Sequence, residues 1–258
     1  MKSQKISAAI ATFNEENNIV DCLKSLGQFA DEIVVTDGAS TDRTAGIAKE
    51  LGAKVINTTN KSMFHINKNL AIDKCTNQWI FLVDADERVS EDLADEIKKK
   101  VGDNPKENGF WVNRRNWFLG GYLKKGGAYP DRVIRLFRKG KGRLPEVSVH
   151  EQVEIDGETG HLENDILHLA DPDFARYLMR ANRYTDQTAK YLKKKKIDTG
   201  PVSIFQYTFV KPVSTFISIY CVHRGYVDGF RGFIWALFSA AHHFYAFVKY
   251  SQSQRDKS

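Results

Sequence analysis

Cysteine is scarce in this chain of 258 residues, and the three that occur, Cys22, Cys75 and Cys221, lie far apart. No two of them form a C-x-x-C pair. A disulfide framework needs paired cysteines, and a structural zinc site needs closely spaced thiolates. The sequence therefore predicts neither, and it suits a reducing compartment such as the cytoplasm.

Several enzyme motifs are also missing: G-x-G-x-x-G, G-x-x-x-x-G-K-[ST], G-x-S-x-G and H-E-x-x-H. The first two cradle phosphates, the third presents a nucleophilic serine and the fourth binds a catalytic zinc ion. Their absence argues against a dinucleotide oxidoreductase, a P-loop enzyme, a serine hydrolase of that type and a zinc protease.

Long apolar runs are lacking too. Residues 6–13 are apolar but run straight into Asn14-Glu15-Glu16 with no cleavage site, so we expect no secretory signal. The best candidate for a membrane span is the uncharged stretch of 17 residues from Gly232 to Val248. As a helix it would reach about 25 Å, less than a hydrocarbon core of about 30 Å. We expect that it does not cross a membrane.

Positive charge and aromatic residues are concentrated near the C-terminus. The chain has 38 Lys or Arg and 32 Asp or Glu, whereas residues 190–258 hold 11 and 3, a net charge of +8. Of the 30 aromatic residues, 14 fall in residues 199–258. This composition favours contact with an anionic membrane surface, and no motif for nucleic-acid binding accompanies the charge. The alternative for residues 199–258 is packing on the rest of the protein or in a homodimer interface.

The first hundred residues alternate strand and helix patterns, which predicts an α/β fold with a parallel sheet covered on both faces. The expected strands are residues 6–11, 32–36, 54–56 and 79–83. Ligands in such sheets bind beyond the carboxyl ends of the strands. Polar residues fall at these ends: Asn14, Asp37, Asp84 and Asp86.

The rest of the chain predicts a division at the Gly200-Pro201 break. We expect residues 1–198 to form a catalytic domain, with a nucleotide and metal half to about residue 100 and an acceptor half of short strands and a helix after it. Residues 199–258 would form a basic, aromatic-rich helical extension.

The strongest local signal is an apolar strand that ends in Asp84-Ala85-Asp86-Glu87. Mg²⁺ and Mn²⁺ bind through one or two carboxylates and complete their shell with water and phosphate oxygens. A cation held there could stabilise a departing diphosphate. The alternative is a strand-end turn with solvated acids.

Three ordered segments resemble family 2 glycosyltransferases: residues 11–16, 32–42 and 82–88. The chain is most similar to the sub-group of lipopolysaccharide-core β-glucosyltransferases, which it also resembles at residues 131–138, 149–151 and 226–229. One departure is Asp37-Gly38-Ala39-Ser40, where the family usually has Asp-Ser-Gly-Ser or Asp-Asp-Gly-Ser.

The resemblance implies a GT-A fold, a Rossmann-like mixed sheet that binds a nucleotide sugar. It also implies an inverting, metal-dependent transfer (Mg²⁺ or Mn²⁺) of a glucose-like hexose from a UDP-sugar to a hydroxyl of the lipopolysaccharide core or another glycolipid. Such an enzyme would be cytoplasmic and peripheral on the inner face of the membrane.

The resemblance also implies roles for individual residues. Asp86 would bind the metal, with Asp84 at the ribose or the metal. The expected donor-site residues are Thr12, Asn14, Glu15, Asp37, Lys68 and Asp84.

An inverting transfer needs a base that takes the proton of the acceptor hydroxyl. Glu151 is the first choice, His150 beside it is an orienting residue or second candidate, and Asp131 is the alternative.

Two other functions compete. A haloacid-dehalogenase-like phosphohydrolase also uses D-x-D after a buried strand, but its motif has Thr or Val where this chain has Arg88. A non-catalytic nucleotide-binding membrane adaptor is disfavoured by the intact Asp84 and Asp86.

Overall fold

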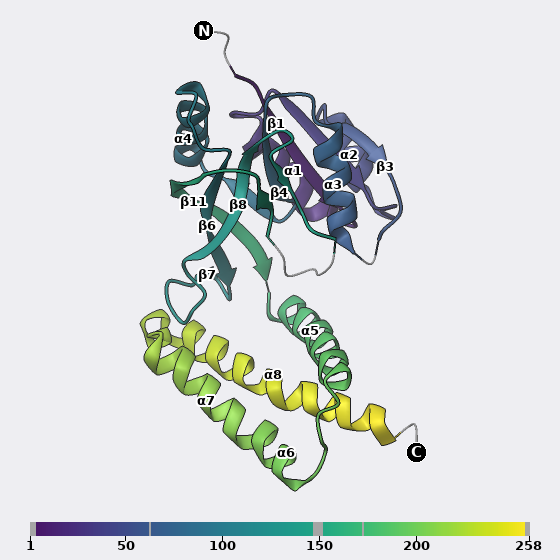
Figure 1. Cartoon of the computed structure of the whole chain (residues 1–258), viewed down its shortest axis with the longest axis vertical. Coiled ribbons are helices and arrows are strands. Elements are labelled where there is room, and N and C mark those ends of the chain that lie inside the picture. The colour runs from purple at the N-terminus through teal and green to yellow at the C-terminus, as the bar shows by residue number, and fades with distance from the viewer. Residues whose placement is uncertain (1–3, 62, 147–151, 172, 256–258) are drawn as a thin grey trace. The chain divides into compact units, whose positions relative to one another are not determined.

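The structure is a computed structural model that describes residues 4–61, 63–146, 152–171 and 173–255 (Figure 1). It divides into two compact units. The first unit comprises residues 1–114 and 131–168, and the second comprises residues 115–130 and 169–258.

A mixed sheet forms the centre of the first unit. Within the described ranges it has nine strands in the order β3-β2-β1-β4-β8-β6-β11-β5, with β7 paired to β6. The first four of that order pair in parallel, and β8 joins β4 in the antiparallel sense. Their bounds are β1 Ile6–Thr12, β2 Glu32–Asp37, β3 Lys54–Asn57, β4 Trp79–Asp84, β5 Glu87–Val89, β6 Gly109–Phe118, β7 Gly121–Tyr122, β8 Asp131–Arg138 and β11 Thr159–Asp171. A separate ladder joins β9 (Gly142–Arg143) to β10 (Glu154–Ile155).

Helices cover both faces of the parallel strands. They are α1 (Glu16–Leu26), α2 (Thr44–Glu50), α3 (Phe64–Lys74) and α4 (Glu91–Gly102). Side chains of β4 alternate between two hydrophobic clusters: Phe81 packs with α1 and α4, and Ile80 packs with α3. Because both faces are buried, the strand reads as a continuous apolar run. The predicted α/β class with a doubly covered parallel sheet is confirmed.

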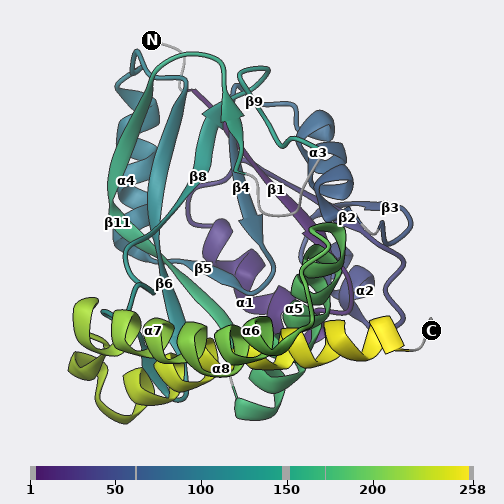
Figure 2. The ribbon, with the colours of Figure 1, turned by 60° about the horizontal axis from the view of Figure 1, so that its bottom comes forward.

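The second unit is mainly helical. It contains α5 (Phe174–Lys194), α6 (Pro201–Phe205), α7 (Lys211–Ile217) and α8 (Gly229–Arg255), with π-helical turns at Gln206–Val210 and Ser218–Val222 and a 3-10 turn at Gly225–Asp228. Helix α8 packs against α5 through a hydrogen bond between Thr188 and His242, and against α7 through one between Thr215 and His243. Figure 2 shows α7 running alongside α8.

The units differ from the division predicted at residue 198. Helix α5 belongs with the C-terminal helices, as does the segment 115–130. The reason is aromatic packing, because Phe118 contacts both Tyr177 of α5 and Trp235 of α8, with ring centroids 5.0 and 5.7 Å apart. No helix in the described part of the chain is long and apolar enough to cross a membrane.

Asp228 fastens the segment 115–130 to the helices. Its carboxylate, 7% exposed as a residue, accepts hydrogen bonds from the backbone N–H of Lys124 at 3.0 and 3.1 Å and of Lys125 at 2.9 Å. The motif noted at residues 226–229 therefore has a structural role.

We predict that Asp228→Ala lowers the free energy of unfolding by about 1–2 kcal/mol, because two partly buried backbone N–H groups lose a charged acceptor. Asp198→Ala is the control, since Asp198 accepts a solvent-exposed hydrogen bond from the N–H of Gly200, and we expect a change below about 1 kcal/mol. Urea unfolding followed by circular dichroism measures both. Equal effects of the two substitutions would contradict the assignment.

Candidate functional site

The carboxyl ends of β1, β2 and β4 meet at one edge of the sheet. In the parallel register Thr12 lies opposite Asp37, and Ala11 lies opposite Asp84. Three of the polar positions predicted for the site therefore stand within one register step of each other. Ligands bind at such an edge in open α/β sheets.

The loops after β1 and β2 are hydrogen-bonded to each other. The N–H of Asn14 donates to Ser40 Oγ at 2.9 Å, and Asn14 Oδ1 accepts from the N–H of Thr41 at 2.8 Å. The N–H of Glu15 donates to Thr44 Oγ1 at 2.8 Å. Asn14 has a φ of 55°, a conformation that asparagine tolerates better than most residues. These bonds fix the positions of both loops.

The turn after β2 explains the unusual order of Gly38 and Ala39. Asp37 is buried, and its two oxygens accept from the N–H and hydroxyl of Ser40 at 2.9 and 2.6 Å. A Cβ at position 38 would lie 3.3 Å from the Thr12 carbonyl oxygen, so the chain approaches closely there. Ala39, however, has a φ of 63°. The left-handed position, where the similar family has glycine, is held here by an alanine.

Asp84 lies between two cations. It forms ion pairs with Lys68 of α3 and with Arg135 Nη2 of β8, the latter at 2.9 Å. Burial alone would raise the pKa of Asp84, but Lys68 and Arg135 together hold it well below its ordinary value. The Lys68 ammonium also lies 5.1 Å from the centroid of the Phe64 ring. Asp84 is thus ionised and held in place before any ligand binds.

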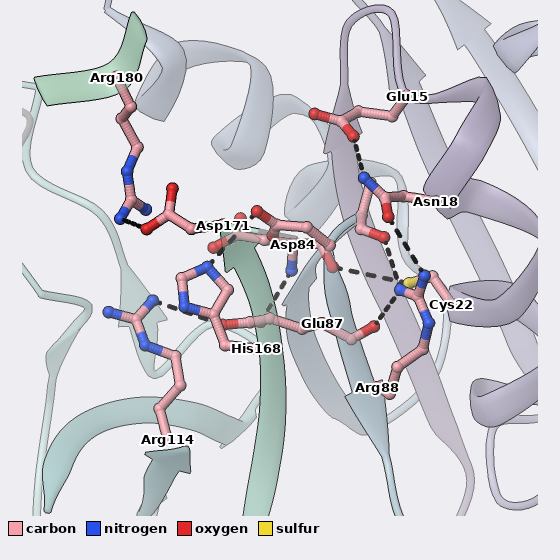
Figure 3. A network of polar contacts seen from close by, with 12 residues as sticks. Glu15, Asn18, Cys22, Asp84, Glu87, Arg88, Arg114, His168, Asp171 and Arg180 are labelled. Atoms are coloured by element: carbon pink, nitrogen blue, oxygen red, sulfur yellow. Dashed lines mark hydrogen bonds and ion pairs between the residues drawn. The ribbon is translucent and has the colours of Figure 1, made fainter. Parts of the chain in front are cut away.

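Next to Asp84, a chain of charged side chains runs through the buried Glu87 (Figure 3). Glu87 is fully buried, and its Oε2 accepts from the N–H of Asp84 at 3.0 Å, while its Oε1 accepts from Arg135 Nη2 at 2.5 Å. Arg114 lies 3.5 Å from Glu87 Oε1 and donates from Nε and Nη2 to Asp131 Oδ2 at 2.9 and 2.7 Å. Burial disfavours the charged guanidinium of Arg135, but Glu87 and Asp84 raise its pKa above the ordinary value.

Asp86 lies beside a histidine that is distant in the sequence but comes from the neighbouring strand β11. Asp86 Oδ2 and His168 Nε2 of β11 lie 3.4 Å apart, and their side chains are 20% and 12% exposed. Carboxylates suit Mg²⁺ and Mn²⁺, and imidazole is the commonest metal ligand. No group of three or more His, Cys, Asp or Glu that could hold a metal ion occurs among the described residues. The Asp86–His168 pair therefore fits a cation that takes its remaining ligands from water and a bound diphosphate.

The side chains of Arg88 and Cys22 contact backbone carbonyl oxygens of the turn that carries Asp86. Arg88 Nη1 donates to the carbonyl oxygens of Ala85 and Glu87, each at 2.9 Å, and the Cys22 thiol lies 3.6 Å from the Asp84 carbonyl oxygen. Burial raises the pKa of Cys22, so it remains a thiol. These contacts fix the direction in which Asp84 and Asp86 point.

Most of the residues predicted for the site lie at this edge. Lys68 and Asp131 join Asp84 through the ion pairs described above, and Glu15 accepts from Asn18 Nδ2 at 2.7 Å beside Asn14. The two other candidates for the base, Glu151 and His150, lie outside the described residues.

Four further residues complete the site: Glu87, Arg114, Arg135 and His168. Glu87 follows the acidic pair directly, and the three-residue spacing of Arg132, Arg135 and Arg138, unusual for a strand, suggests from the sequence that some of these arginines point to phosphates. Because side chains alternate along a strand, Arg135 points to the face opposite Arg132 and Arg138. His168 lies in β11, a strand that was not predicted from the sequence. The buried residues Leu162, Ile166 and Ala170 nevertheless recur on one face of that strand.

Comparisons with known proteins agree with this architecture. The family model described as Glycosyl transferase family 2 matches residues 7–150. The lipopolysaccharide core biosynthesis glycosyltransferase LpsC of Rhizobium meliloti is 27% identical over 255 residues, which cover 92% of this chain and 90% of LpsC.

Two solved structures show the same fold. One is the mannosyltransferase PcManGT of Pyrobaculum calidifontis in complex with GDP-Man and Mn²⁺, with a TM-score of 0.54, 13% identity and coverage of 96% and 87% of the two chains. The other is S. aureus TarS 1–349 in complex with UDP, with a TM-score of 0.51, 14% identity and coverage of 98% and 92%. The predicted GT-A fold is confirmed by these similarities.

We predict that Ala39→Gly raises the free energy of unfolding by up to about 1 kcal/mol, because glycine adopts the left-handed conformation without the steric penalty of a Cβ. Ala45→Gly, the same chemical change in the right-handed helix α2, should instead lower it, by up to about 1 kcal/mol. Differential scanning calorimetry compares the two. A lower melting temperature for Ala39→Gly would refute the account of this turn.

Proposed function

Because this chain belongs to glycosyl transferase family 2, we propose that it transfers a glucose-like hexose, with inversion, from a UDP-sugar to a hydroxyl of the lipopolysaccharide core or another glycolipid. The observation that carries the proposal is the position of Asp84 and Asp86 at the end of β4, on the edge shared with Thr12 and Asp37. Because the chain belongs to this family, we interpret the acidic pair as part of a glycosyltransferase site and not as the nucleophile and acid of a phosphohydrolase.

The nucleotide would bind over the two hydrogen-bonded loops, along Thr12, Asn14, Glu15 and Asp37. The Thr12 hydroxyl supports this placement, because it is buried and has no hydrogen-bond partner in the described part of the chain. Buried polar groups are rarely left unpaired, so a ligand atom is a reasonable partner. TarS has been solved with UDP and PcManGT with GDP-Man, so both neighbours bind nucleoside diphosphates, of which UDP is the one proposed here.

Asp86 and His168 would hold the divalent cation, Mg²⁺ or Mn²⁺, and Asp84 would contact the ribose or the cation. When bound, the cation neutralises charge on the departing diphosphate. The Lys68 ammonium beside Asp84 supplies a further positive charge for the same phosphates. Arg135 and Glu87 act as positioning residues, since both contact Asp84 from the buried side.

Glu151 is the proposed base, and it would take the proton from the acceptor hydroxyl as that oxygen attacks the sugar. Asp131 is the second candidate. Its Oδ2 already accepts two hydrogen bonds from Arg114, so that oxygen is engaged by the guanidinium. His150, next to Glu151 in the chain, would orient it or replace it.

The acceptor class follows from the similarity to LpsC and from the basic second unit. A glycolipid acceptor lies in a membrane, so we propose that the enzyme works as a peripheral protein on the inner face of the cytoplasmic membrane.

We expect the wild-type protein with UDP and Mn²⁺ to show a higher melting temperature than with either alone, and to transfer hexose from a UDP-sugar in a donor screen read by mass spectrometry. Asp86→Ala should keep the fold, lose the Mn²⁺-dependent part of the thermal shift and lose at least about a hundredfold in turnover.

Asp156→Ala is the control for this substitution, because Asp156 is an exposed acid whose carboxylate pairs with Lys141 at the surface of the first unit, 2.6 Å away. It should behave as wild type. An Asp86→Ala protein that retains more than a tenth of the activity, together with an unchanged Mn²⁺ shift, would exclude the metal assignment. Release of free phosphate without transfer would exclude the function.

For the base, Glu151→Gln should lower turnover about a hundredfold or more while the melting-temperature shift with UDP stays unchanged, because a general base acts on the acceptor. Asp131→Asn is the comparison. If Asp131→Asn alone is inactive, the base is Asp131, and if both variants remain active, His150→Ala is the next variant to measure.

A further inference from the structure

The continuous helical segment Pro201–Val222, which consists of α6, α7 and their π-helical turns, carries an exposed apolar row. Phe205, Phe209, Val213 and Ile217 recur every four residues and are 61%, 57%, 55% and 49% exposed. In an uninterrupted α-helix a four-residue repeat drifts around the axis, but a π-helical turn contains more residues. The π-helical turn at Gln206–Val210 reduces this drift, so the row stays on one face.

The opposite face of this helical segment is covered by α8. Tyr207 stacks on Phe247 with ring centroids 4.8 Å apart, and Phe216 packs edge-on against Phe233 at 5.8 Å. On the exposed face Phe205 and Phe209 contact each other, with centroids 5.7 Å apart. The exposed row is therefore a continuous apolar surface on a well-packed support.

The charge around this row is positive. Residues 199–227 contain no Asp or Glu, and their charged residues are Lys211 and Arg224. Lys193–Lys196 lie at the end of α5, shortly before the helical segment begins at Pro201. The second unit as a whole has 17 Lys or Arg and 6 Asp or Glu, a net charge of +11. An apolar partner with a negatively charged boundary fits this surface.

An anionic lipid bilayer has those two properties. A second copy of the chain would bring an equally positive unit against this one, which like-charge repulsion disfavours. Since no described helix is long and apolar enough to span a membrane, the surface suits a helix that lies in the plane of the interface.

We propose that the helical segment Pro201–Val222 lies in the headgroup region of an anionic bilayer. Its residues Phe205, Phe209, Val213 and Ile217 would lie among the acyl chains, and Lys193–Lys196 would lie against the lipid phosphates. The proposal deepens the membrane location given under the proposed function. Its test uses no sugar donor, so its failure and the failure of the transferase assignment can be told apart.

The test is sedimentation of the full chain with vesicles of phosphatidylcholine, with and without one quarter phosphatidylglycerol. The double variant Phe205→Ser/Phe209→Ser should bind the anionic vesicles at least about tenfold more weakly than wild type. The control is Leu178→Ser/Met179→Ser on α5, which removes two apolar side chains that are 42% and 68% exposed but lie outside the row. It should bind as wild type does.

A second variant, with Lys193–Lys196 changed to Gln, should lose most of the preference for anionic vesicles and most of the salt dependence of binding. Melting temperatures and transfer to a soluble acceptor fragment show whether each variant is folded and active. Wild-type binding by the Phe205→Ser/Phe209→Ser protein would overturn the proposal. So would a change from dimer to monomer in that variant without lipid, which would assign the row to a second copy.

Discussion

A carboxylate with no access to water determines how the site is built. Glu87 is fully buried, and a charge in that position is tolerated only when it is paired and hydrogen-bonded. Arg135 and Arg114 provide the pairing, and the backbone N–H of Asp84 provides the hydrogen bond. Each of these partners also holds a residue at the ligand edge, so the buried charge dictates the geometry that a ligand meets.

The charges of this cluster balance. Three carboxylates, Asp84, Glu87 and Asp131, meet three cations, Lys68, Arg114 and Arg135. A balanced cluster does not attract a cation strongly by itself. Asp86, the carboxylate proposed to bind the metal, lies outside this cluster, two residues after Asp84 and 3.4 Å from His168.

The parts of the site that local sequence could predict are those on consecutive parallel strands. Asp37 and Asp84 each end an apolar run, and the β-α-β order brings such ends together without knowledge of any distant contact. Arg114, Arg135 and His168 come from β6, β8 and β11, whose positions depend on pairings between segments far apart in the chain. Register between such strands is set by tertiary packing, which a single sequence does not reveal.

The same limit applies to the division of the chain. The Gly200-Pro201 break is a real helix boundary, since α6 begins at Pro201. It does not separate compact units, because the aromatic contacts of Phe118 and the hydrogen bonds of Asp228 join residues more than a hundred positions apart. Such contacts leave no trace in composition or periodicity.

Two of the three borders between the units fall inside strands, β6 and β11, and the third falls directly before β8. The chain passes from one unit to the other after Arg114, after Pro130 and after His168. A single proteolytic cut therefore cannot release either unit intact. A gene fragment that stops before α6 would leave Tyr177 and Phe118 without Trp235, so it would lack part of the aromatic packing of the second unit.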